Sequence, residues 1–301
     1  MSVSLSLEST RHGVPQSGPR LLISRQLADR AVAALVAEAF LTPKPALVDR
    51  RGPGAHHDLD LPRLLRSAAA LRDGFERMAE CAVGGSPTLS LREELGEIGR
   101  DAEQDMLAAT AGSNAHRGGI WVLGLLVAAR AIVDGGANPP AVARMAGMIA
   151  RLPDRFAPAV ASNGARVCER YGVGGARGEA CEGFPHVVNV GLPALLSARE
   201  RGVDETCARL DTLIAIMAHL PDTCLLHRGG WEALRAAQVG ARAVMDRGGT
   251  STEAGRHALS ALDNDLLTRW ASPGGSADLL AACLFLDEQP TLEEVRIPWN
   301  N

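Results

Sequence analysis

Aromatic residues make up only 3% of this 301-residue chain, which contains a single tyrosine. The chain therefore has few of the stacking surfaces that proteins use to bind single-stranded nucleic acid. It also lacks a large charge of either sign, since its formal net charge is −4 and its pI is about 6.1. We expect neither nucleic acid nor an anionic membrane as a partner on electrostatic grounds.

The six cysteines form no Cys-x-x-Cys pair, and none lies near a histidine at the spacing of a zinc finger. This pattern predicts reduced thiols in a cytoplasmic protein. The longest apolar run, 120–129, is too short to cross a bilayer and predicts a buried helix. The first residues show neither the basic start nor the continuous apolar stretch of a signal peptide. We therefore expect no membrane association.

Strand patterns are almost absent, whereas helical periodicity recurs along the whole chain. Asp60 reads as the N-cap of a helix over 61–82, and Ser90 with Glu93 reads as a capping box. Gly135, Gly172, Gly202 and Gly248 stand where helices would end in a left-handed residue. We predict an all-α fold of roughly ten helices in one globular domain, residues 23–301, after a loose N-terminal tail, residues 1–22. The remaining predicted helices follow Ser24 or span 120–134, 139–151, 154–171, 187–201, 204–220, 230–247, 252–270 and 276–287.

Five connecting segments are unusually rich in Gly, His, Asp, Asn and Arg. Glycines before a helix N-terminus expose backbone N–H groups that bind phosphate, and carboxylates beside imidazoles suit a hard metal ion or acid–base chemistry. Each segment alone could be an ordinary connector, but together they predict one site, with the loops converging at one end of the domain. The segments are 44–60, 111–119, 172–184, 223–230 and 272–278.

Some polar residues near these segments favour a structural interpretation. Asp60 alone suits the N-cap role, and Cys224 beside His227 suits a packed thiol better than a nucleophile, because no third orienting group is identifiable. The other histidines without a polar neighbourhood also favour structural roles; they are His12, His186, His219 and His257.

The five segments together resemble the triphosphoribosyl-dephospho-CoA synthase family, whose members serve the prosthetic group of citrate lyase or of malonate decarboxylase. One such segment would be a weak signal, but five in order from Lys44 to Leu286 are specific. The family is all-α, which agrees with the helical periodicity. The matching stretches read KPALVDRRGPGAHHDLD, AGSNAHRGGIWVLGLL, YGVGGARGEACEGFP, TCLLHRGG and SPGGSADLLAACLFL.

This resemblance implies a pentosyltransferase. Such an enzyme joins ATP and 3′-dephospho-CoA through a new ribose–ribose bond, releases adenine and yields 2′-(5″-triphosphoribosyl)-3′-dephospho-CoA. A separate transferase then attaches the product to an acyl carrier protein. ATP is thus a substrate, Mg²⁺ is expected beside its phosphates, and a homo-oligomer is compatible with the pattern.

Two departures bear on the branch of the family. The family often has Gly where this chain has Ala46, and Asn-Thr-His-Lys-Gly where this chain has Asn114-Ala115-His116-Arg117-Gly118. Arginine keeps the charge of lysine but presents it in a different geometry. The form NAHRGGIW resembles the malonate decarboxylase branch.

Resemblance and chemistry together imply a set of site residues. A carboxylate near the ribose would stabilise oxocarbenium character, and His56, Asp58 and Glu179 remain alternatives for the base that activates the acceptor hydroxyl. Asp49, His56 and Asp58 are expected to affect turnover, and Asp60 only stability. The candidates are Asp49, His56, Asp58 and Glu179 as catalytic residues; Lys44, Asn114, His116, Arg117, Gly118, Arg177, Gly178, Arg228, Ser272, Gly274 and Gly275 as substrate- and phosphate-binding residues; and Asp49, Asp58 and Asp278 as metal ligands.

Two other functions stay open at this point. A metal-dependent enzyme like the ADP-ribosyl hydrolases would also be all-α and rich in loop aspartates, and it would use water as the acceptor. A nucleotide- or CoA-binding module would bind its ligand without turnover.

Overall fold

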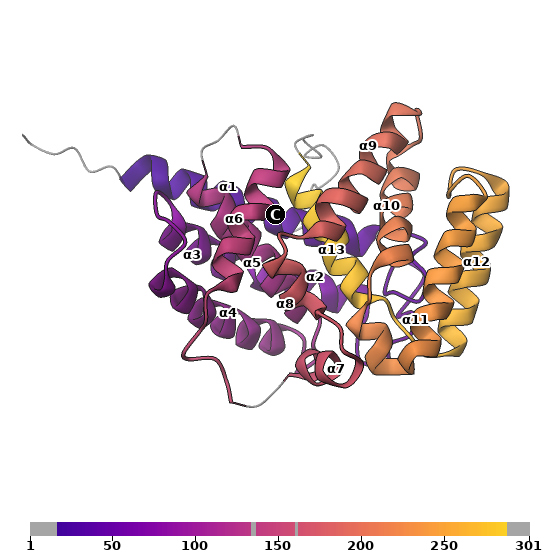
Figure 1. The fold of residues 1–301 in the computed structure, drawn as a ribbon, viewed down its shortest axis with the longest axis horizontal. Coiled ribbons are helices and arrows are strands. Elements are labelled where there is room, and N and C mark those ends of the chain that lie inside the picture. The colour runs from indigo at the N-terminus through magenta and orange to yellow at the C-terminus, as the bar shows by residue number, and fades with distance from the viewer. Residues whose placement is uncertain (1–16, 134–136, 160–161, 288–301) are drawn as a thin grey trace, which may run out of the picture.

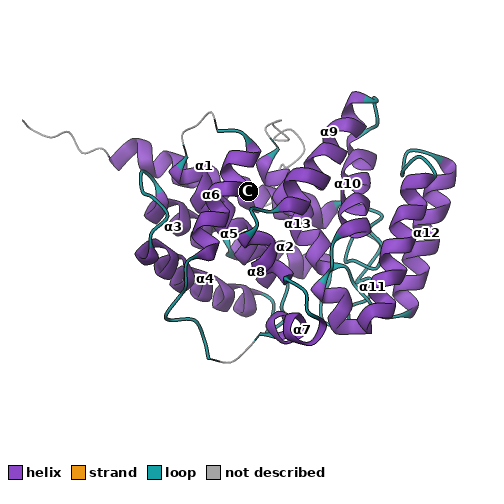
Figure 2. Ribbon diagram, viewed as in Figure 1, coloured by secondary structure: helices purple, strands orange, loops and turns teal. Residues whose placement is uncertain are grey.

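The computed structural model describes residues 17–133, 137–159 and 162–287. Within these ranges the chain is helical and contains no β-strand, and the only bridge pairs Asp49 with Gly52 (Figure 2). The all-α prediction is therefore confirmed. None of the described helices is both long and apolar enough to cross a membrane.

The described residues form thirteen α-helices and one short π-helical segment (Figure 1). The predicted helix over 61–82 is divided at Leu71, and the one over 154–171 is shorter than expected. The elements are α1 (Ser17–Phe40), α2 (Leu61–Ala70), α3 (Arg72–Ala82), α4 (Leu89–Ala109), α5 (Arg117–Ile132), α6 (Pro139–Arg151), α7 (Asn163–Tyr171), α8 (Gly175–Cys181), η1 (Val187–Gly191), α9 (Leu192–Glu200), α10 (Glu205–His219), α11 (Thr223–Asp246), α12 (Glu253–Thr268) and α13 (Gly274–Leu286).

Local capping explains several helix ends. Asp60 caps α2 by accepting the Arg63 N–H at 2.8 Å, as predicted. The predicted capping box of Ser90 with Glu93 is wrong, because Thr88 caps α4 and the Glu93 carboxylate pairs with Arg155. A long-range ion pair thus replaced the local contact that the sequence pattern indicated.

The helix boundaries correct one further expectation and confirm another. Helix α1 begins at Ser17, so part of the predicted tail 1–22 is helical, and residues 1–16 lie outside the described residues. Gly172, Gly202 and Gly248 adopt left-handed conformations after helices, as predicted. Gly135 is not among the described residues.

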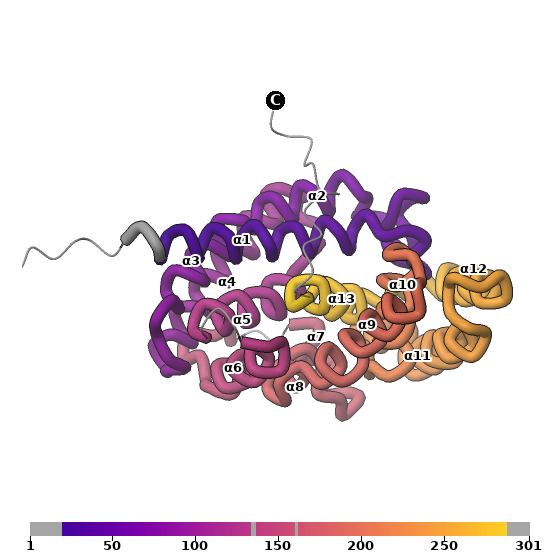
Figure 3. The backbone as a smooth tube through the Cα atoms, turned by 90° about the horizontal axis from the view of Figure 1, so that it is seen from above, coloured from indigo at the N-terminus to yellow at the C-terminus, as the bar shows by residue number. Residues whose placement is uncertain are grey.

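Helix α13 lies at the centre of the molecule (Figures 1 and 3). It packs against α1, α5 and α10, and its side chains are buried on all sides. One apolar cluster joins it to α1, α3, α5 and α6, and a second cluster joins it to α10, α11 and α12. The N-terminus of α13, where the segment 272–278 begins, is therefore held firmly between both halves of the core.

Candidate functional site

The segment 44–60 is organised around the buried carboxylate of Asp49. Its two oxygens accept the backbone N–H groups of Lys44 and Arg51, at 2.8 and 2.7 Å, and pair with the Arg51 guanidinium. Arg51 also reaches Asp263 of α12 at 2.6 Å. Since both Asp49 oxygens are engaged inside the protein, this carboxylate shapes the loop, and its predicted roles in catalysis and metal binding would require it to exchange these contacts.

Lys44, the only lysine of the chain, is also enclosed. Its side chain is 1% exposed, and its ammonium group donates to the carbonyl oxygen of Glu38 at 2.7 Å and to the Glu38 carboxylate. The charge is thus already paired and shielded from solvent, so the predicted phosphate contact of this ammonium would require the pair with Glu38 to open.

A hydrogen-bonded chain joins three of the candidate residues. Arg228 donates to His56 Nδ1 at 3.1 Å, and His56 Nε2 lies 2.9 Å from Ser272 Oγ. A guanidinium can only donate, so Nδ1 is the acceptor and Nε2 carries the proton toward Ser272. Burial, followed by the charge of Arg228, lowers the pKa of His56 to about 4, so the imidazole is neutral near pH 7.

Asp58 presents the accessible carboxylate of this segment. Its side chain is 60% exposed and lies 3.9 Å from the His56 ring, while its backbone oxygen accepts the hydroxyl of Ser113 at 2.8 Å. Arg228 is exposed and binds the Ala55 carbonyl at 2.7 Å. The exposed Asp58 carboxylate and the exposed Arg228 guanidinium of the segment 223–230 thus both lie beside the His56 ring.

The start of α5 meets the start of α13 at a glycine. A Cβ on Gly118 would lie 1.9 Å from Asp278 Oδ2, so only glycine permits this approach, and the Gly119 N–H donates to Asp278. Arg117 is partly exposed and pairs with Glu103, and Asn114 accepts its backbone N–H at 3.2 Å. The first turn of α5 therefore faces a carboxylate.

Within the described ranges, the buried carboxylate of Asp278 has only one hydrogen-bond donor, the Gly119 N–H, to stabilise its negative charge. Burial, together with the nearby carboxylates of Glu38 and Asp222, raises its pKa well above the usual range, and the Gly119 N–H opposes that shift. A proton or a bound cation would offset this charge. Among the residues that the structure describes, however, no three His, Cys, Asp or Glu side chains form a group that could hold a metal ion.

Asp222 connects the segments 223–230 and 272–278. It caps α11 through the Cys224 N–H and also accepts the N–H groups of Gly275 and Ser276 and the Ser276 hydroxyl. Cβ atoms on Gly274 and Gly275 would lie 3.1 and 2.9 Å from Cys224 and Asp222, so both glycines serve packing. Burial and the Asp222 charge raise the pKa of the Cys224 thiol, as expected for a packed thiol.

In the segment 172–184, Glu179 is buried and bound to His186. Its carboxylate accepts the His186 backbone N–H at 2.8 Å and lies 2.7 Å from Nδ1, which raises the pKa of that imidazole. The sequence missed this pair, because His186 had no polar neighbourhood along the chain. By contrast, Arg177 is exposed and forms no ion pair within the described parts of the chain, and Gly178 next to it has open space around its Cα.

Direct contacts connect all five segments. The first segment touches the second through Ser113, the fourth through Arg228 and the fifth through Ser272. The third lies against the fourth where Gly175 approaches Thr223. These contacts confirm that the five segments meet. The expectation that all of them are loops is wrong, because residues 223–230 form the first turns of α11 and residues 175–181 form α8.

Comparison with known proteins identifies the family to which this chain belongs. A family model described as ATP:dephospho-CoA triphosphoribosyl transferase matches residues 24–296, and this range includes all five segments. The chain belongs to this transferase family.

Curated relatives agree with the transferase family. A protein of Pseudomonas fluorescens strain Pf-5 is 54% identical over 92% of this chain and 95% of its own length. A protein of Azotobacter vinelandii is 54% identical over 89% of this chain and 93% of its own. Both carry the name probable 2-(5″-triphosphoribosyl)-3′-dephosphocoenzyme-A synthase. No solved structure matches the chain significantly.

Strained backbone is concentrated at the transferase segments. The four described residues other than glycine with positive φ are Ala46, Ala111, Phe184 and Trp270, at 51 to 56°. All four lie within the segments or two residues before one, where such strain often accompanies function. At Ala46, φ is 54°, a backbone conformation that glycine adopts without strain.

The structure adds Arg92 of α4 to the flank of the site. Its guanidinium lies 5.2 Å from the centre of the Trp121 ring, and its buried Nε has no hydrogen-bond partner in the described residues. Trp121 in turn donates to the Ala176 carbonyl at 3.0 Å. Burial lowers the pKa of Arg92, the charge of Asp154, 3.6 Å away, opposes this shift, and the charges of Arg177 and Arg100 add to it.

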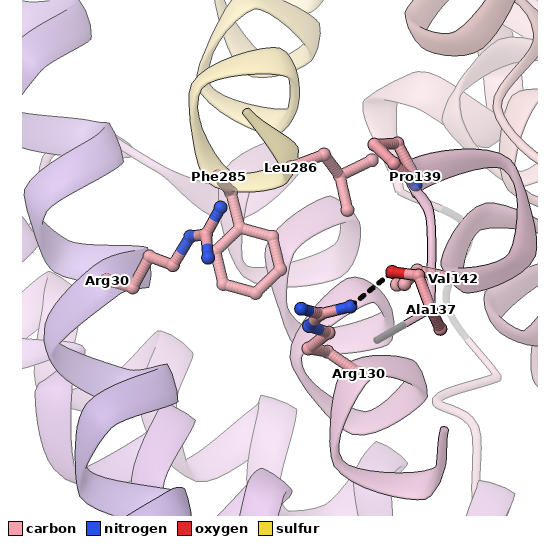
Figure 4. A pocket seen from close by; sticks show the side chains of 7 residues that line it. All are labelled: Arg30, Arg130, Ala137, Pro139, Val142, Phe285 and Leu286. Atoms are coloured by element: carbon pink, nitrogen blue, oxygen red, sulfur yellow. Dashed lines mark hydrogen bonds between the residues drawn. The ribbon is translucent and has the colours of Figure 1, made fainter. Parts of the chain in front are cut away.

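Two hollows lie away from the five segments. A groove of about 800 Å³ runs between α11 and α12 and is lined by Arg235, His257 and Arg269 among others. A much smaller pocket of about 10 Å³ lies where Arg30 packs over Phe285 and Arg130 donates to the Ala137 carbonyl (Figure 4). It has room for about one water molecule. Neither hollow contains a candidate site residue.

The buried imidazoles of this transferase predict a pH-dependent stability. Burial lowers the pKa of His116, which lies beside Ser67 at 2.7 Å, to about 4, as it does for His56. The unfolded imidazoles take up protons near pH 6.5, whereas the folded ones do so only near 4. The free energy of unfolding should therefore fall by about 1.4 kcal/mol per pH unit per imidazole between these values.

Urea denaturation at pH 7, 6 and 5 measures this slope. The variant His116→Gln cannot take up a proton, so its stability should fall less steeply than that of the unmodified protein. Equal slopes would show that His116 does not contribute to the pH dependence.

Proposed function

We propose that this protein transfers the 5-triphosphoribosyl group of ATP to the 2′-hydroxyl of 3′-dephospho-CoA, releases adenine and forms 2′-(5″-triphosphoribosyl)-3′-dephospho-CoA. The contact of all five family segments with one another, in a chain of that family, supports this proposal most strongly. Where the first, fourth and fifth segments meet, they bring together an exposed cation, Arg228, an exposed carboxylate, Asp58, and the neutral imidazole of His56.

The transferred group keeps its triphosphate, so about four negative charges have to be held without cleavage. Arg177 and Arg228 are exposed and have no carboxylate partner among the described residues, so they are the cations best able to bind phosphates. Arg117 would have to exchange its ion pair with Glu103 for a phosphate. At the start of α5 the N–H groups of Arg117 and Gly119 are already bonded to Asn114 and Asp278, so a phosphate bound there would have to displace these side chains.

In the reaction the C1′–N9 bond of ATP breaks and a bond forms between C1′ and the acceptor oxygen. The proton of the acceptor hydroxyl leaves, and adenine gains a proton as it departs. We assign Asp58 to stabilise the positive ribose or to accept the hydroxyl proton, because its carboxylate is exposed and lies 3.9 Å from His56 Nδ1. The neutral His56 orients Ser272, whose own hydrogen remains available to a substrate oxygen.

The donor set also fits Mg²⁺ held jointly by substrate phosphates and one or two carboxylates. Asp278, with a single backbone donor, and the exposed Asp58 are the residues that would hold it, and it would neutralise triphosphate charge. Asp49 would have to exchange its internal bonds with Lys44 and Arg51 to join this set. Glu179 would act through His186.

We further propose that the product passes to a separate transferase acting on an acyl carrier protein, and that this chain serves the malonate decarboxylase branch in the cytoplasm. The NAHRGGIW form of the second segment supports the branch, and six free thiols suit a reducing compartment. The oligomeric state is open to measurement by sedimentation.

The release of adenine tests the proposed reaction directly. Purified protein is incubated with ATP, 3′-dephospho-CoA and Mg²⁺, and adenine is measured by chromatography. Adenine is expected only when both substrates are present. Adenine from ATP alone would instead show a hydrolase, and its absence with binding retained would show a nucleotide-binding module. Repeating the reaction in excess chelator tests the metal, because the proposal expects adenine release to stop.

A further inference from the structure

Trp270 stands at a position where helices usually place glycine. It follows the last residues of α12, and its φ of 51° is left-handed. The Trp270 N–H donates to the Leu267 carbonyl at 3.0 Å and the next N–H to the Leu266 carbonyl at 3.0 Å, which is the bonding pattern of a Schellman motif. A residue with a large side chain is strained in this conformation, whereas glycine is not.

Burial of the side chain does not compensate for this strain. Trp270 is 52% exposed, although the chain contains only four tryptophans. One of its contacts is a stack on His57, with ring centres 4.3 Å apart and an angle of 27° between the planes. The stack orients the indole while about half of the residue remains open to solvent. The presence of a tryptophan at position 270 is therefore explained neither by the backbone conformation, which favours glycine, nor by packing in the core.

Trp270 borders the polar chain of the candidate site. Ser272, two residues further on, is the hydroxyl that His56 contacts. Arg228, which contacts His56 on its other side, also lies 3.5 Å from the Trp270 carbonyl oxygen. A planar apolar surface thus adjoins an exposed guanidinium without a carboxylate partner in the described chain.

We propose that the exposed part of the Trp270 indole is the stacking surface for the adenine ring of a nucleotide substrate, with Arg228 reaching the ribose or phosphates attached to that ring. Stacking a base on an aromatic side chain stabilises binding without reading its edge. His57 supports the indole from the other side. The identity of the ligand as a nucleotide rests on the proposed function; the stacking surface itself rests on the geometry of Trp270.

The variant Trp270→Gly separates binding from folding. Glycine suits the left-handed conformation, so the melting temperature should stay the same or rise, while the stacking surface is lost. We expect the Kd measured by calorimetry to rise about 5- to 150-fold for ATP or for 3′-dephospho-CoA, and the nucleotide affected tells which adenine stacks there. Trp270→Phe should restore most of the affinity.

Two controls exclude a general disturbance. Binding of inorganic tripolyphosphate, which has no base, should be the same in Trp270→Gly and in the unmodified protein. Phe156→Leu removes another exposed aromatic ring, 65% exposed and outside the five segments, and should bind both nucleotides normally.

Several results would overturn the inference. These are unchanged Kd values for both nucleotides in Trp270→Gly, an equal loss of tripolyphosphate binding, or a loss of affinity in Trp270→Gly that Trp270→Phe fails to restore. Sedimentation showing that Trp270→Gly only dissociates a dimer would assign the indole to a contact between chains. These are binding measurements, so they are independent of adenine release. If the protein releases adenine normally and Trp270→Gly leaves both Kd values unchanged, only the stacking surface is refuted. If nucleotide binding depends on Trp270 but no adenine is released, only the proposed reaction is refuted.

Discussion

Asp58→Asn is expected to slow adenine release by at least about 100-fold while leaving the free energy of unfolding within about 0.5 kcal/mol of the unmodified value. The Asp58 carboxylate is 60% exposed, so it contributes little to folding. Its contact to the segment 111–119 uses the backbone oxygen, which the substitution leaves in place. The change therefore removes charge where the ribose becomes positive and preserves the loop.

Asp60→Asn is the matched control, since it makes the same change two residues further along. Asp60 accepts the Arg63 N–H at the start of α2, and asparagine caps helices as well as aspartate does. Adenine release and stability should both stay close to normal, whereas Asp60→Ala should lose about 1 kcal/mol of stability and keep its turnover. Steady-state adenine release and urea denaturation measure both quantities.

Normal turnover in Asp58→Asn would remove Asp58 from the catalytic assignment. An inactive but stable Asp60→Ala would show instead that the second carboxylate also takes part in the reaction.

Asp222→Ala is expected to lower the free energy of unfolding by about 3–5 kcal/mol. The buried Asp222 carboxylate accepts four donors from the first turns of α11 and α13: the N–H groups of Cys224, Gly275 and Ser276, and the Ser276 hydroxyl. Alanine would leave these donors without an acceptor in a region closed to water, at a cost of about 1–3 kcal/mol for each unsatisfied group before relaxation. The substitution should also make the segment 272–278 less rigid, because it removes the hydrogen bonds of Gly275 and Ser276 to Asp222.

Asp204→Ala provides the comparison for this variant. Asp204 also caps a helix, α10, by accepting the Cys207 N–H at 3.1 Å, but it is exposed and its side chain accepts no bond from another helix. Its loss should cost only about 1 kcal/mol, because water can replace the cap. Thermal and urea denaturation at pH 7 measure both variants, and equal losses would show that the bridge between α11 and α13 adds nothing to capping.

The helices themselves could be predicted from local patterns. The apolar run 120–129 became the buried part of α5, and the charge and shape of Asp60 matched its role as a cap. The prediction of a helix cap was wrong where a residue distant in sequence bound the side chain that was expected to form the local cap. Arg155, 62 residues away in sequence, took the Glu93 carboxylate from the predicted capping box, and a sequence pattern contains no information about such a partner.

In the candidate site, too, some features could be predicted from local sequence patterns and others depended on distant residues. Composition and order of the five glycine-rich segments were enough to predict the family and the convergence of the segments. The use of each charged side chain was not predictable, because acids and cations of one segment look alike in sequence. Asp49 and Asp58 are nine residues apart, yet Asp49 is enclosed by Arg51 and backbone N–H groups while Asp58 faces solvent.

The sequence alone thus determined the helical fold and the segments that form the site, because helical periodicity, capping residues and glycine-rich turns act over a few residues. Only the tertiary structure decided which side chains remain available to a substrate. Lys44 is buried against Glu38, Glu179 is paired with His186, and Trp270 has a strained and exposed position. Burial and charge pairing depend on contacts in the folded chain, which local sequence patterns do not encode.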